Sequence, residues 1–333
     1  MSQDSSRLPP PAPLDLRDAE AVAAVFHDAA RACRDAPGRR GSTVHLPAHG
    51  HLLVTGDLHD HALNYQRILK LARLGSPAAP LPSSDADGQN GSEPNGSNHS
   101  ATNPANECGS GGRHLILHEV IHGPDRVNGH DLSVRMLARC ADLKRRHPEH
   151  VHVLLSNHEL AQLRGEGITK DGVSVVELFN QGVDFLYGNA ADDIREAISD
   201  YVRSLPLAVR CDNGLMISHS LPAPRRIEDF DKAVLERELS DDDLAPKGSA
   251  YDMVWGRYQN QKITEELADA WGVEAFIVGH QPAEMGYEPV ARNTLIIASD
   301  HNHGVALSID LARHYRRPQL IHAVRALAGV PIP

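Results

Sequence analysis

Five short segments of the chain each follow a hydrophobic run with residue types that bind metal ions. In order, the segments are TGDLHD at 55–60, LILHEVIHG at 115–123, LLSNHEL at 154–160, LMISHS at 215–220 and FIVGHQP at 276–282. Residues that follow the strands of an α/β sheet can converge on one pocket edge. Asp, His, Asn and Glu side chains gathered at such an edge can hold two metal ions. The order of the segments therefore predicts a two-metal site.

Each segment is ambiguous when it is taken alone. Asp57 and His59 stand two residues apart at the end of a strand, so both side chains leave the same side and can grip one cation; alternatively, they cap the following helix. Single histidines after a strand, such as His219 and His280, are more often structural. Asn157 is a weak ligand unless a neighbouring anion already anchors the ion. The prediction therefore depends on all five segments together.

Alternating strand and helix patterns place these segments along the chain. Strand patterns lie at 43–56, 113–121, 151–156, 207–219 and 274–279, and helical patterns lie at 16–36, 61–74, 130–146, within 174–204, at 225–240 and at 261–271. The runs 294–298 and 304–310 predict a terminal hairpin. Strands that alternate with helices first and pair with each other late predict an α/β fold, a layered sandwich with mixed sheets.

The composition predicts one ordered domain. A chain of 333 residues with 41% hydrophobic content can bury one large core, and we assign it to a single domain over 15–330. Residues 1–14 are polar and Pro-rich and are expected to be disordered. The stretch 76–112 is rich in Gly, Ser, Asn and Pro and nearly lacks large apolar residues, so we expect a disordered insertion inside the domain.

Charge and cysteine content narrow the class of protein. The 33 Lys and Arg residues against 44 Asp and Glu residues give a net charge of −11, which argues against non-specific binding to nucleic acid or an anionic membrane. The cysteines Cys33, Cys108, Cys140 and Cys211 lack Cys-x-x-Cys spacing and are expected to be reduced and mostly buried. The N-terminal residues contain no apolar signal region, so we expect a cytoplasmic protein.

Taken together, the five segments resemble the calcineurin-like metallophosphoesterases, and most of all their phosphoprotein phosphatase branch. That branch carries the motifs GDxHG, GDxVDRG, GNHE, HGG and a late His in a GH or AH context. The corresponding residues are Gly56-Asp57-Leu58-His59-Asp60, His118-Glu119-Val120-Ile121-His122-Gly123, Ser156-Asn157-His158-Glu159, Ser218-His219-Ser220 and Gly279-His280-Gln281-Pro282. The resemblance spans about 50–310 and implies the layered α/β/β/α metallophosphoesterase sandwich.

The resemblance also implies a centre with two divalent metal ions, either Mn, Fe or Zn. The implied ligands are Asp57 and His59 for the first ion, Glu119 as the bridge, and Asn157, His219 and His280 for the second. The ions would turn a bridging water into hydroxide near neutral pH, and that hydroxide would attack phosphorus in line. His158, next to a ligand in the sequence, would protonate the leaving oxygen.

The second segment departs from the family pattern. Its bridging carboxylate is Glu119, one methylene longer than the Asp of the family. His122 stands where the family has the Asp that orients the catalytic histidine, and Gly123 stands where it has a phosphate-binding Arg. Asp125 and Arg126, which follow closely, are candidates to supply the orienting carboxylate and the phosphate-binding guanidinium from a shifted loop.

Two further residues are candidates at the substrate. Asp60 replaces the Gly after the first His, and its carboxylate can either hold His158 or repel a phosphate. Arg257, in YDMVWGRYQ at 251–259, resembles the Trp-x-Arg element of bacterial members of the branch, including those that cleave dinucleoside polyphosphates. Its guanidinium can clamp a phosphate, or it can lie on the surface of its own helix.

These residues predict a metal-dependent phosphoesterase that acts on a phosphorylated substrate, either a phosphoprotein or a nucleotide. A protein phosphatase-like activity is the first expectation, and hydrolysis of dinucleoside polyphosphates is the second. The third possibility is of another class, a degenerate phosphatase that binds metal or ligand as a regulatory module. The altered second segment favours the module, whereas the ligands kept in the other four segments favour an active enzyme.

Overall fold

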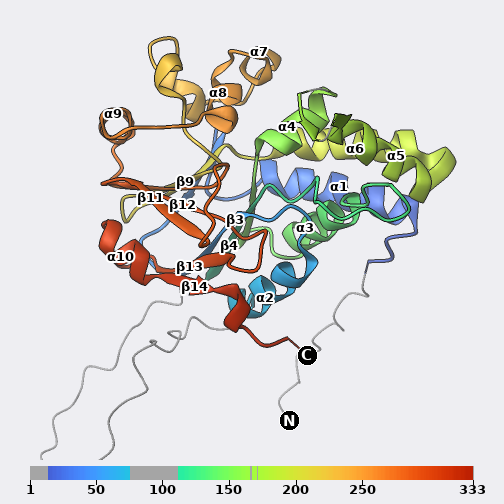
Figure 1. Ribbon diagram of the computed structural model, residues 1–333, viewed down its shortest axis with the longest axis horizontal. Coiled ribbons are helices and arrows are strands. Elements are labelled where there is room, and N and C mark those ends of the chain that lie inside the picture. Colours follow the sequence, from blue (N-terminus) through green and yellow to red (C-terminus); the bar gives the residue numbers. More distant parts are fainter. Residues whose placement is uncertain (1–13, 76–111, 166, 171, 333) are drawn as a thin grey trace, which may run out of the picture.

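The computed structural model describes residues 14–75, 112–165, 167–170 and 172–332 (Figure 1). Apart from residues 14 and 112, the segments 1–14 and 76–112, for which we predict disorder, lie outside the described residues. Of the four cysteines, Cys33, Cys140 and Cys211 are free and buried, as expected, and Cys108 lies outside the described residues.

Two mixed β-sheets form the centre of the domain. The seven-stranded sheet has the order β1 (Arg39–Arg40), β2 (Thr43–Leu46), β8 (Ala208–Cys211), β9 (Leu215–Ser218), β10 (Ala275–Val278), β12 (Thr294–Ile297) and β11 (Tyr287–Ala291). The five-stranded sheet has the order β14 (Val324–Ala326), β13 (Val305–Asp310), β3 (His51–Asp57), β4 (Arg113–His118) and β5 (Val151–Leu154). A separate hairpin pairs β6 (Thr169–Lys170) with β7 (Val173–Ser174).

Neighbouring residues along the central strands face two different cores. In β3, Leu52 and Val54 join residues of the seven-stranded sheet in one apolar cluster, whereas Leu53 belongs to the cluster that contains most of the buried helical residues. In β4, Ile116 joins the first cluster and Leu117 the second. Because the side chains of a strand alternate between faces, these uninterrupted apolar runs mark strands that are covered on both sides.

Helices cover both outer faces of the paired sheets (Figure 1). Their bounds are α1 (Ala19–Arg34), α2 (Ala62–Ala72), α3 (Val134–Arg146), α4 (Asn157–Arg164), α5 (Val175–Tyr187), α6 (Ala191–Ser204), α7 (Asp241–Leu244), α8 (Ser249–Trp255), α9 (Gln261–Trp271) and α10 (Arg317–His322). Helices α2 and α3 contact strands of the five-stranded sheet, and α9 and α10 contact strands of the seven-stranded sheet. This arrangement confirms the predicted layered α/β sandwich with mixed sheets.

Helix α1 is a good example of how the sequence builds these layers. Its buried residues include Val22, Phe26, Ala29 and Cys33, which recur every three or four positions and so form one apolar face. The side chain of Asp18 accepts a hydrogen bond from the backbone of Ala21 and caps the first turn. The apolar face packs against α3 and α6.

The predicted terminal hairpin is wrong. Strand β12 pairs with β10 and β11 in the seven-stranded sheet, whereas β13 pairs with β3 and β14 in the five-stranded sheet. The two runs are close in sequence and both apolar, which is the pattern of a hairpin. Every residue of β12 is buried, however, so the strand occupies an interior place with a neighbour on each side. The connection between the runs therefore crosses from one sheet to the other.

The predicted helix over 225–240 is also wrong. The chain there forms two short 3-10 turns, at Pro224–Arg226 and Lys232–Glu236. The carboxylate of Asp231 accepts from the backbone of Ala233 and starts the second turn inside the stretch. A side chain that bonds to nearby backbone in this way competes with a continuous helix.

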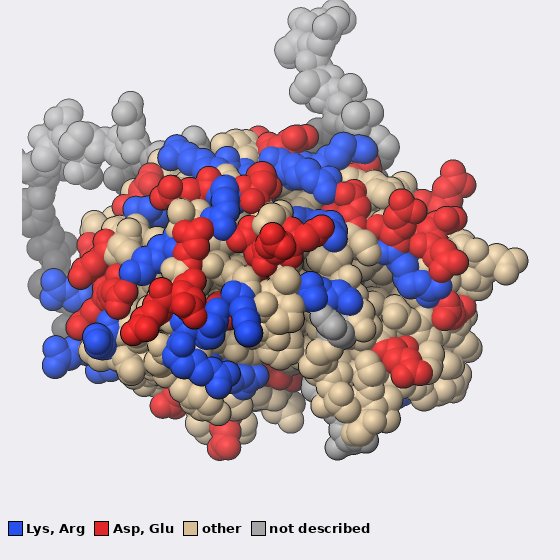
Figure 2. Space-filling view, turned by 90° about the horizontal axis from the view of Figure 1, so that it is seen from above, with Lys and Arg blue, Asp and Glu red and all other residues tan. Residues whose placement is uncertain are grey.

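The surface carries both signs of charge. On the face seen in Figure 2, Lys and Arg side chains lie among Asp and Glu side chains rather than in separate fields. Among the described residues, no helix combines the length and apolar character needed to cross a membrane.

Candidate metal centre

The five segments meet where the two sheets approach each other along one edge. Asp57, the last residue of β3, forms an isolated bridge with Ala298, which directly follows β12. A Cβ atom at Gly56 would lie 2.1 Å from the carbonyl oxygen of Ile297, so only glycine permits this approach. Residues that end strands of both sheets are thereby brought to one place.

Glu119 follows β4, and imidazoles from four other segments gather around its buried carboxylate. The Nε2 atom of His59 lies 3.4 Å from Oε2 of Glu119, and the Nε2 atoms of His219 and His158 lie 3.6 Å and 3.7 Å from Oε1. The ligating atoms of Glu119, His219 and His280 lie within 4.8 Å of one another, as do those of His59, Glu119 and His158. A carboxylate with nitrogen donors on both oxygens is suited to bridge two cations.

The start of α4 holds its histidine close to Glu119. Ser156 caps the helix by accepting from the backbone of Glu159, and the Ser156 hydroxyl also donates to the Glu159 carboxylate. The same carboxylate accepts from the backbone N–H of Val120 at 2.9 Å. Since Val120 directly follows Glu119, this buried contact fixes Asn157 and His158 against the second segment.

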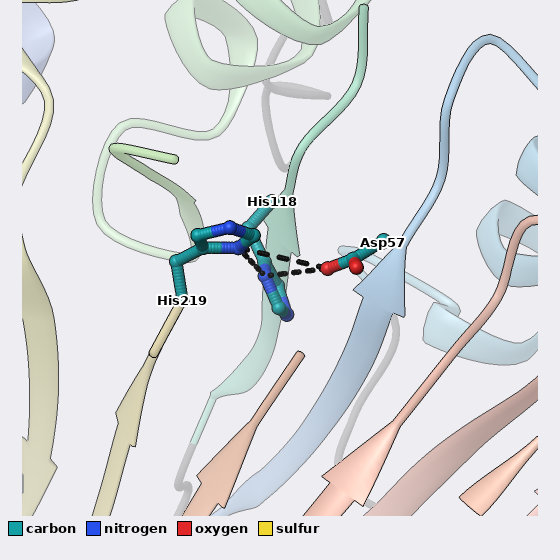
Figure 3. A group of neighbouring side chains, drawn as sticks. All are labelled: Asp57, His118 and His219. Carbon is teal, nitrogen blue, oxygen red and sulfur yellow. Dashed lines mark hydrogen bonds and ion pairs between the residues drawn. The ribbon is translucent and has the colours of Figure 1, made fainter. Parts of the chain in front are cut away.

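Asp57, His118 and His219 form a second group beside Glu119 (Figure 3). The Oδ1 atom of Asp57 lies 3.6 Å from Nδ1 of both histidines, and the two Nδ1 atoms lie 3.2 Å apart. Both oxygens of Asp57 also accept from the backbone N–H of His280, at 3.0 Å and 2.8 Å. Burial raises the pKa of Asp57 to about 7, although hydrogen bonds from Glu119 and the His280 N–H lower it.

This donor set fits divalent cations. Among the described residues, the buried Nε2 atom of His280 has no hydrogen-bond partner, and Nε2 of His219 lies 2.7 Å from Oδ1 of Asn157. Burial lowers the pKa of His118 to about 4 and that of His280 to about 3, and it lowers the pKa of His219 as well. Neutral imidazoles with unused lone pairs, together with carboxylate oxygens, are the ligands that Zn, Mn and Fe share.

Several site residues hold a strained backbone. The φ angles of His59, Asp60, Glu119, His122 and His280 are 42°, 58°, 52°, 59° and 68°. This left-handed region costs a residue other than glycine about 1–3 kcal/mol, and such residues cluster at functional sites. All five residues lie in the segments that form the site.

Gly279 lies directly beneath the Asp57 group. A Cβ atom at this position would lie 2.2 Å from Oδ1 of Asp57 and 2.7 Å from Cε1 of His118. The absence of a side chain therefore allows Asp57 and His118 to occupy their places.

His122 is the partner of His158, a role that the sequence analysis did not assign. The Nδ1 atoms of the two rings lie 3.0 Å apart, and Nε2 of His122 lies 3.2 Å from Oε1 of Gln162. His118 was likewise not assigned. A sequence signal existed in part, because Gln162 follows His158 by four positions and so shares its helix face, and because both new histidines flank Glu119.

The other predicted site residues lie around this centre. Asp60 and Asp125 line a cavity of about 440 Å³, which also borders His59 and the arginines Arg135 and Arg139. Burial raises the pKa of Asp60 to about 7, and the charge of Asp131 raises it further. Asp60 therefore faces a cavity next to the first predicted metal ligand.

Arg126 and Arg257 differ in their relation to the centre. Nη1 of Arg126 donates to the carbonyl of Gly123 at 2.7 Å and lies 3.5 Å from Oδ2 of Asp131. Arg257 is half-buried, and its charge contributes to the lowered pKa of His280, behind the larger effect of burial. The six predicted ligands and His158 are thus brought together, Arg257 is close enough to lower the pKa of His280, and Asp125 lines the cavity next to His59.

Comparison with known proteins supports the architecture. No protein-family model matches the chain, and no curated protein matches it significantly. A protein serine/threonine phosphatase from Saccharomyces cerevisiae with similarity to human phosphatase PP5 has a TM-score of 0.59 at 14% identity, covering 95% of this chain and 91% of that one. A cold-active protein-tyrosine phosphatase of a psychrophilic Shewanella has a TM-score of 0.50 at 14% identity, covering 89% and 84%.

A metallophosphoesterase from Sphaerobacter thermophilus also matches, with a TM-score of 0.34 at 13% identity over 79% of this chain and 84% of that one. The first two likenesses, which span most of both chains, show that this chain has the calcineurin-like phosphoesterase fold that its motifs predicted.

Proposed function

We propose that this protein is a metal-dependent phosphoesterase. The observation that carries the proposal is the convergence on Glu119 of ligating groups from both sheets. His59 and His158 approach it from the five-stranded sheet, and His219 and His280 approach it from the seven-stranded sheet. Such a set of buried donors is costly to assemble without a cation, because it leaves lone pairs facing each other away from water.

The residues that would hold two divalent ions are those predicted from the sequence. Glu119 would bridge the ions, and the remaining ligands are Asp57 and His59 on one side and Asn157, His219 and His280 on the other. When bound, two such ions supply an activated water for attack on phosphorus and neutralise charge on the phosphate oxygens. Zn, Mn and Fe all suit a mixed set of nitrogen and oxygen donors.

His158 would act as the general acid. Its side chain is buried beside Glu119, and its Nε2 atom faces the centre while Nδ1 is held by His122. A proton on Nε2 can pass to the oxygen that leaves phosphorus, which stabilises the departing group. The T-shaped contact with the ring of His59, 4.7 Å between centroids, keeps the imidazole from turning away.

Phosphoproteins are the substrate class that we propose first. Arg257, half-buried near His280, would bind phosphate oxygens through its planar guanidinium. The two structures with TM-scores of 0.59 and 0.50 are described as a protein serine/threonine phosphatase and a protein-tyrosine phosphatase, which supports this class. A dinucleoside polyphosphate is the second candidate, favoured by the aromatic side chain of Trp255, which lies two residues before Arg257. The ring of Trp255 meets the ring of His280 edge-on, with 6.3 Å between the centroids.

An active enzyme is also a better account than a degenerate binding module. The changes in the second segment do not leave an empty position, because His122 occupies the place from which a partner reaches His158. The primary ligands of both ions remain within reach of one another. A module that only bound a ligand would have no need of a held and oriented His158.

The test uses the full-length protein and p-nitrophenyl phosphate with added Mn²⁺. We expect close to two metal equivalents after reconstitution and hydrolysis that depends on the metal. His158→Ala should lower kcat by about 10²–10⁴-fold and keep the metal, since it removes a general acid and no ligand. His314→Ala, which changes an exposed histidine paired with Glu274, is the matched control and should leave kcat unchanged.

A metal content well below one equivalent, together with hydrolysis that Mn²⁺ does not raise, would overturn the proposal. Unchanged hydrolysis in His158→Ala would leave the metal-dependent enzyme standing and overturn only the role of His158 as the acid. A panel of phosphopeptides and diadenosine polyphosphates then separates the two substrate classes by kcat/KM.

A further inference from the structure

A second cavity lies on the outer face of the seven-stranded sheet. Its volume is about 410 Å³, and side chains from β2, β8 and β9 form its floor. Across these strands, His45 pairs in register with Arg210, and Arg210 pairs with Met216. Val44 and Val209, the residues directly before His45 and Arg210, belong to the apolar cluster that contains residues of both sheets. Because side chains of a strand alternate between faces, the row of His45, Arg210 and Met216 faces outward.

Two segments form the walls of this cavity. Leu235, in the second 3-10 turn, forms one wall, and Trp271, at the end of α9, forms the other. The hydroxyl of Thr43 in β2 donates to the carbonyl oxygen of Leu235 at 2.9 Å and ties the first wall to the sheet. Nε1 of Trp271 donates to the carbonyl oxygen of Lys232 in the same 3-10 turn, at 3.1 Å, and so joins the walls. The cavity is therefore formed before any ligand binds, as is usual for small-molecule sites.

Positively charged side chains gather in the cavity. Arg40 and Arg210 both line it together with His45, and among the described residues of the lining the acidic one is Glu236. Burial lowers the pKa of His45, and the charges of Arg40 and Arg210 lower it further, whereas Asp212 raises it. Since both arginines act on the same ring, the two guanidinium groups lie close to His45. The cavity thus combines two permanent positive charges with a single negative one.

Within the described part of the chain, neither Arg40 nor Arg210 forms an ion pair with a carboxylate. Nη2 of Arg210 donates to the carbonyl oxygen of Gly272 at 3.3 Å, which uses one of the five N–H donors of a guanidinium. Arg39, the neighbour of Arg40, shows the opposite case, because its guanidinium donates to the carbonyl oxygen of Ser204 at 3.1 Å. Arg39 therefore serves the fold, whereas Arg40 and Arg210 retain donors for an anionic ligand.

We propose that this cavity binds a small organic phosphate, in which a phosphate group is joined to an apolar or aromatic body. The planar guanidinium groups of Arg40 and Arg210 bind the phosphate oxygens, and Met216, Leu235 and Trp271 contact the body. The volume of about 410 Å³ lies within the range of small-molecule sites, about 300–1,000 Å³. A nucleoside monophosphate combines the two required parts.

The apolar wall and the acidic side chain narrow the class of ligand. Leu235 and Trp271 are each 8% exposed, so each presents an edge rather than a broad face to the cavity. Inorganic phosphate would leave these edges in contact with water, which favours a ligand with an apolar part. Glu236 repels any further negative group on the ligand, which favours a single phosphate over a polyphosphate.

The cavity is separate from the metal centre. Met216 precedes the predicted ligand His219 by three positions, and three residues of a strand span about 10 Å. Of the described residues that line the cavity, none is among the predicted ligands. The inference therefore does not rest on the proposed phosphoesterase activity.

The two tryptophans of the chain report on the two sites separately. Trp271 lines the cavity, whereas the ring of Trp255 meets that of His280 in the metal centre. The probe is the phosphonate analogue of adenosine monophosphate, whose carbon–phosphorus bond a phosphoesterase does not hydrolyse. In the full-length, metal-loaded protein labelled with ¹⁵N-tryptophan, we expect the probe to shift the indole N–H resonance of Trp271 until it saturates. Trp271→Phe identifies that resonance by its loss.

Three results of this titration would overturn the inference. The first is a Trp271 resonance that stays in place at probe concentrations on the order of 10 mM. The second is a shift of the Trp255 resonance alone, which would locate binding at the metal centre only. The third is equal binding of adenosine or of inorganic phosphate, since we expect each to bind at least about ten-fold more weakly than the probe.

Variants of the two arginines test the proposed phosphate contacts. Arg210→Met and Arg40→Met should each weaken binding of the probe about 10–100-fold, because each removes a charged group that donates hydrogen bonds to phosphate. Arg31→Met, which changes an exposed arginine paired with Asp28, is the matched control and should bind as the unaltered protein does. Glu236→Gln should tighten binding, because it removes the repelling charge.

Arg40 is exposed, so Arg40→Met tests the inference even if Arg210→Met does not fold. An affinity in Arg40→Met equal to that of the unaltered protein would overturn the role of the guanidinium groups. Because the readout is binding at Trp271, the outcome is independent of hydrolysis. A protein that binds the probe there but hydrolyses no phosphate ester would retain this site, while the proposed function would fail.

Discussion

Strand β4 has a cluster of histidines at each end. The two clusters differ in the charged residues around them and in their capacity to hold a metal ion. At the end of the strand, His118 meets His219 and lies beside Asp57 and Glu119. At its beginning, Nδ1 of His114 lies 3.4 Å from Nε2 of His152, and the ring of His150 packs edge-on against His114 at 5.1 Å.

The charges around the clusters have opposite signs. Asp57, Glu119 and Glu159 are buried at the first cluster. At the second, the buried cation Lys144 helps to lower the pKa of His152, behind the larger effect of burial. Within the described residues, all groups with the geometry to hold a metal include Asp57 or Glu119, and none includes His114 or His152. Histidine content alone therefore does not make a metal site, because the carboxylates decide which cluster attracts a cation.

Glu119→Gln is the sharpest way to break this distinction. The change keeps the size of the side chain but removes the charge that both predicted ions share, so we expect the metal content to fall and hydrolysis to drop about 10³-fold or more. His152→Gln at the other cluster is the comparison and should leave metal content and kcat within about two-fold. A loss of metal in His152→Gln would contradict the division between the clusters.

Gly279→Ala tests whether the first cluster depends on its close packing. A methyl group would lie 2.2 Å from Oδ1 of Asp57, so we expect Asp57 to move and hydrolysis to fall about 10²-fold. Gly329→Ala, which meets nothing within 4 Å, is the matched control. Hydrolysis of p-nitrophenyl phosphate and metal analysis of both variants provide the measurement, and equal activity in the two would refute the tight fit.

Acid pH should affect the second cluster through stability. Burial lowers the pKa of His114 from 6.5 to about 4, so folding disfavours its protonated form. The neutral His114 therefore favours the folded state fully above pH 6.5, and this stability is lost as the pH falls toward 4. At pH 5 the loss in the free energy of unfolding is about 2 kcal/mol. His114→Gln should flatten the fall in the free energy of unfolding between pH 7 and pH 5, measured by urea titration. The exposed His314→Gln should retain it, and parallel slopes in all three proteins would contradict this explanation.

The smallest expected effect is on KM and concerns one positively charged side chain near each cluster, Arg257 at the first and Lys144 at the second. Arg257→Ala should raise KM about ten-fold with a smaller change in kcat, because a guanidinium that binds phosphate contributes roughly 1.5–3 kcal/mol. Lys144→Met, at the second cluster, should leave KM unchanged even if it alters stability. An unchanged KM in Arg257→Ala would remove this residue from the substrate site.

The sequence was most informative about residues that can bind a metal ion and that also stand at the end of an apolar strand. Residues such as Asp57 and His280 end apolar runs, and the common edge of the sheets follows from that placement. The role of His122 was not predictable in the same way, because the family pattern indicated only a missing carboxylate. The contact of His122 with His158 and Gln162 becomes visible only when α4 places those two side chains beside it.

The errors have a similar physical origin. The run 304–310 has the apolar pattern of a strand, and that part of the prediction is correct, but its partner is β3 rather than the neighbouring run. Pairing of strands depends on which sheet has a place to fill, and local pattern does not contain that information. In 225–240, the local bond made by Asp231 decided the structure against a longer helix.

The close approach of β3 to β12 at Gly56 affects how the two sheets are held together. Asp57 and Glu119 belong to one sheet and His219 and His280 to the other, so a bound cation is shared across the line where the sheets meet. A ligand that binds only the folded state stabilises it in proportion to its occupancy. A bound cation would thus link the two sheets and stabilise their packing against each other. In the metal-loaded protein, the amide hydrogens of His280 and Ser299, both bonded to Asp57, would exchange with solvent more slowly than in the metal-free protein.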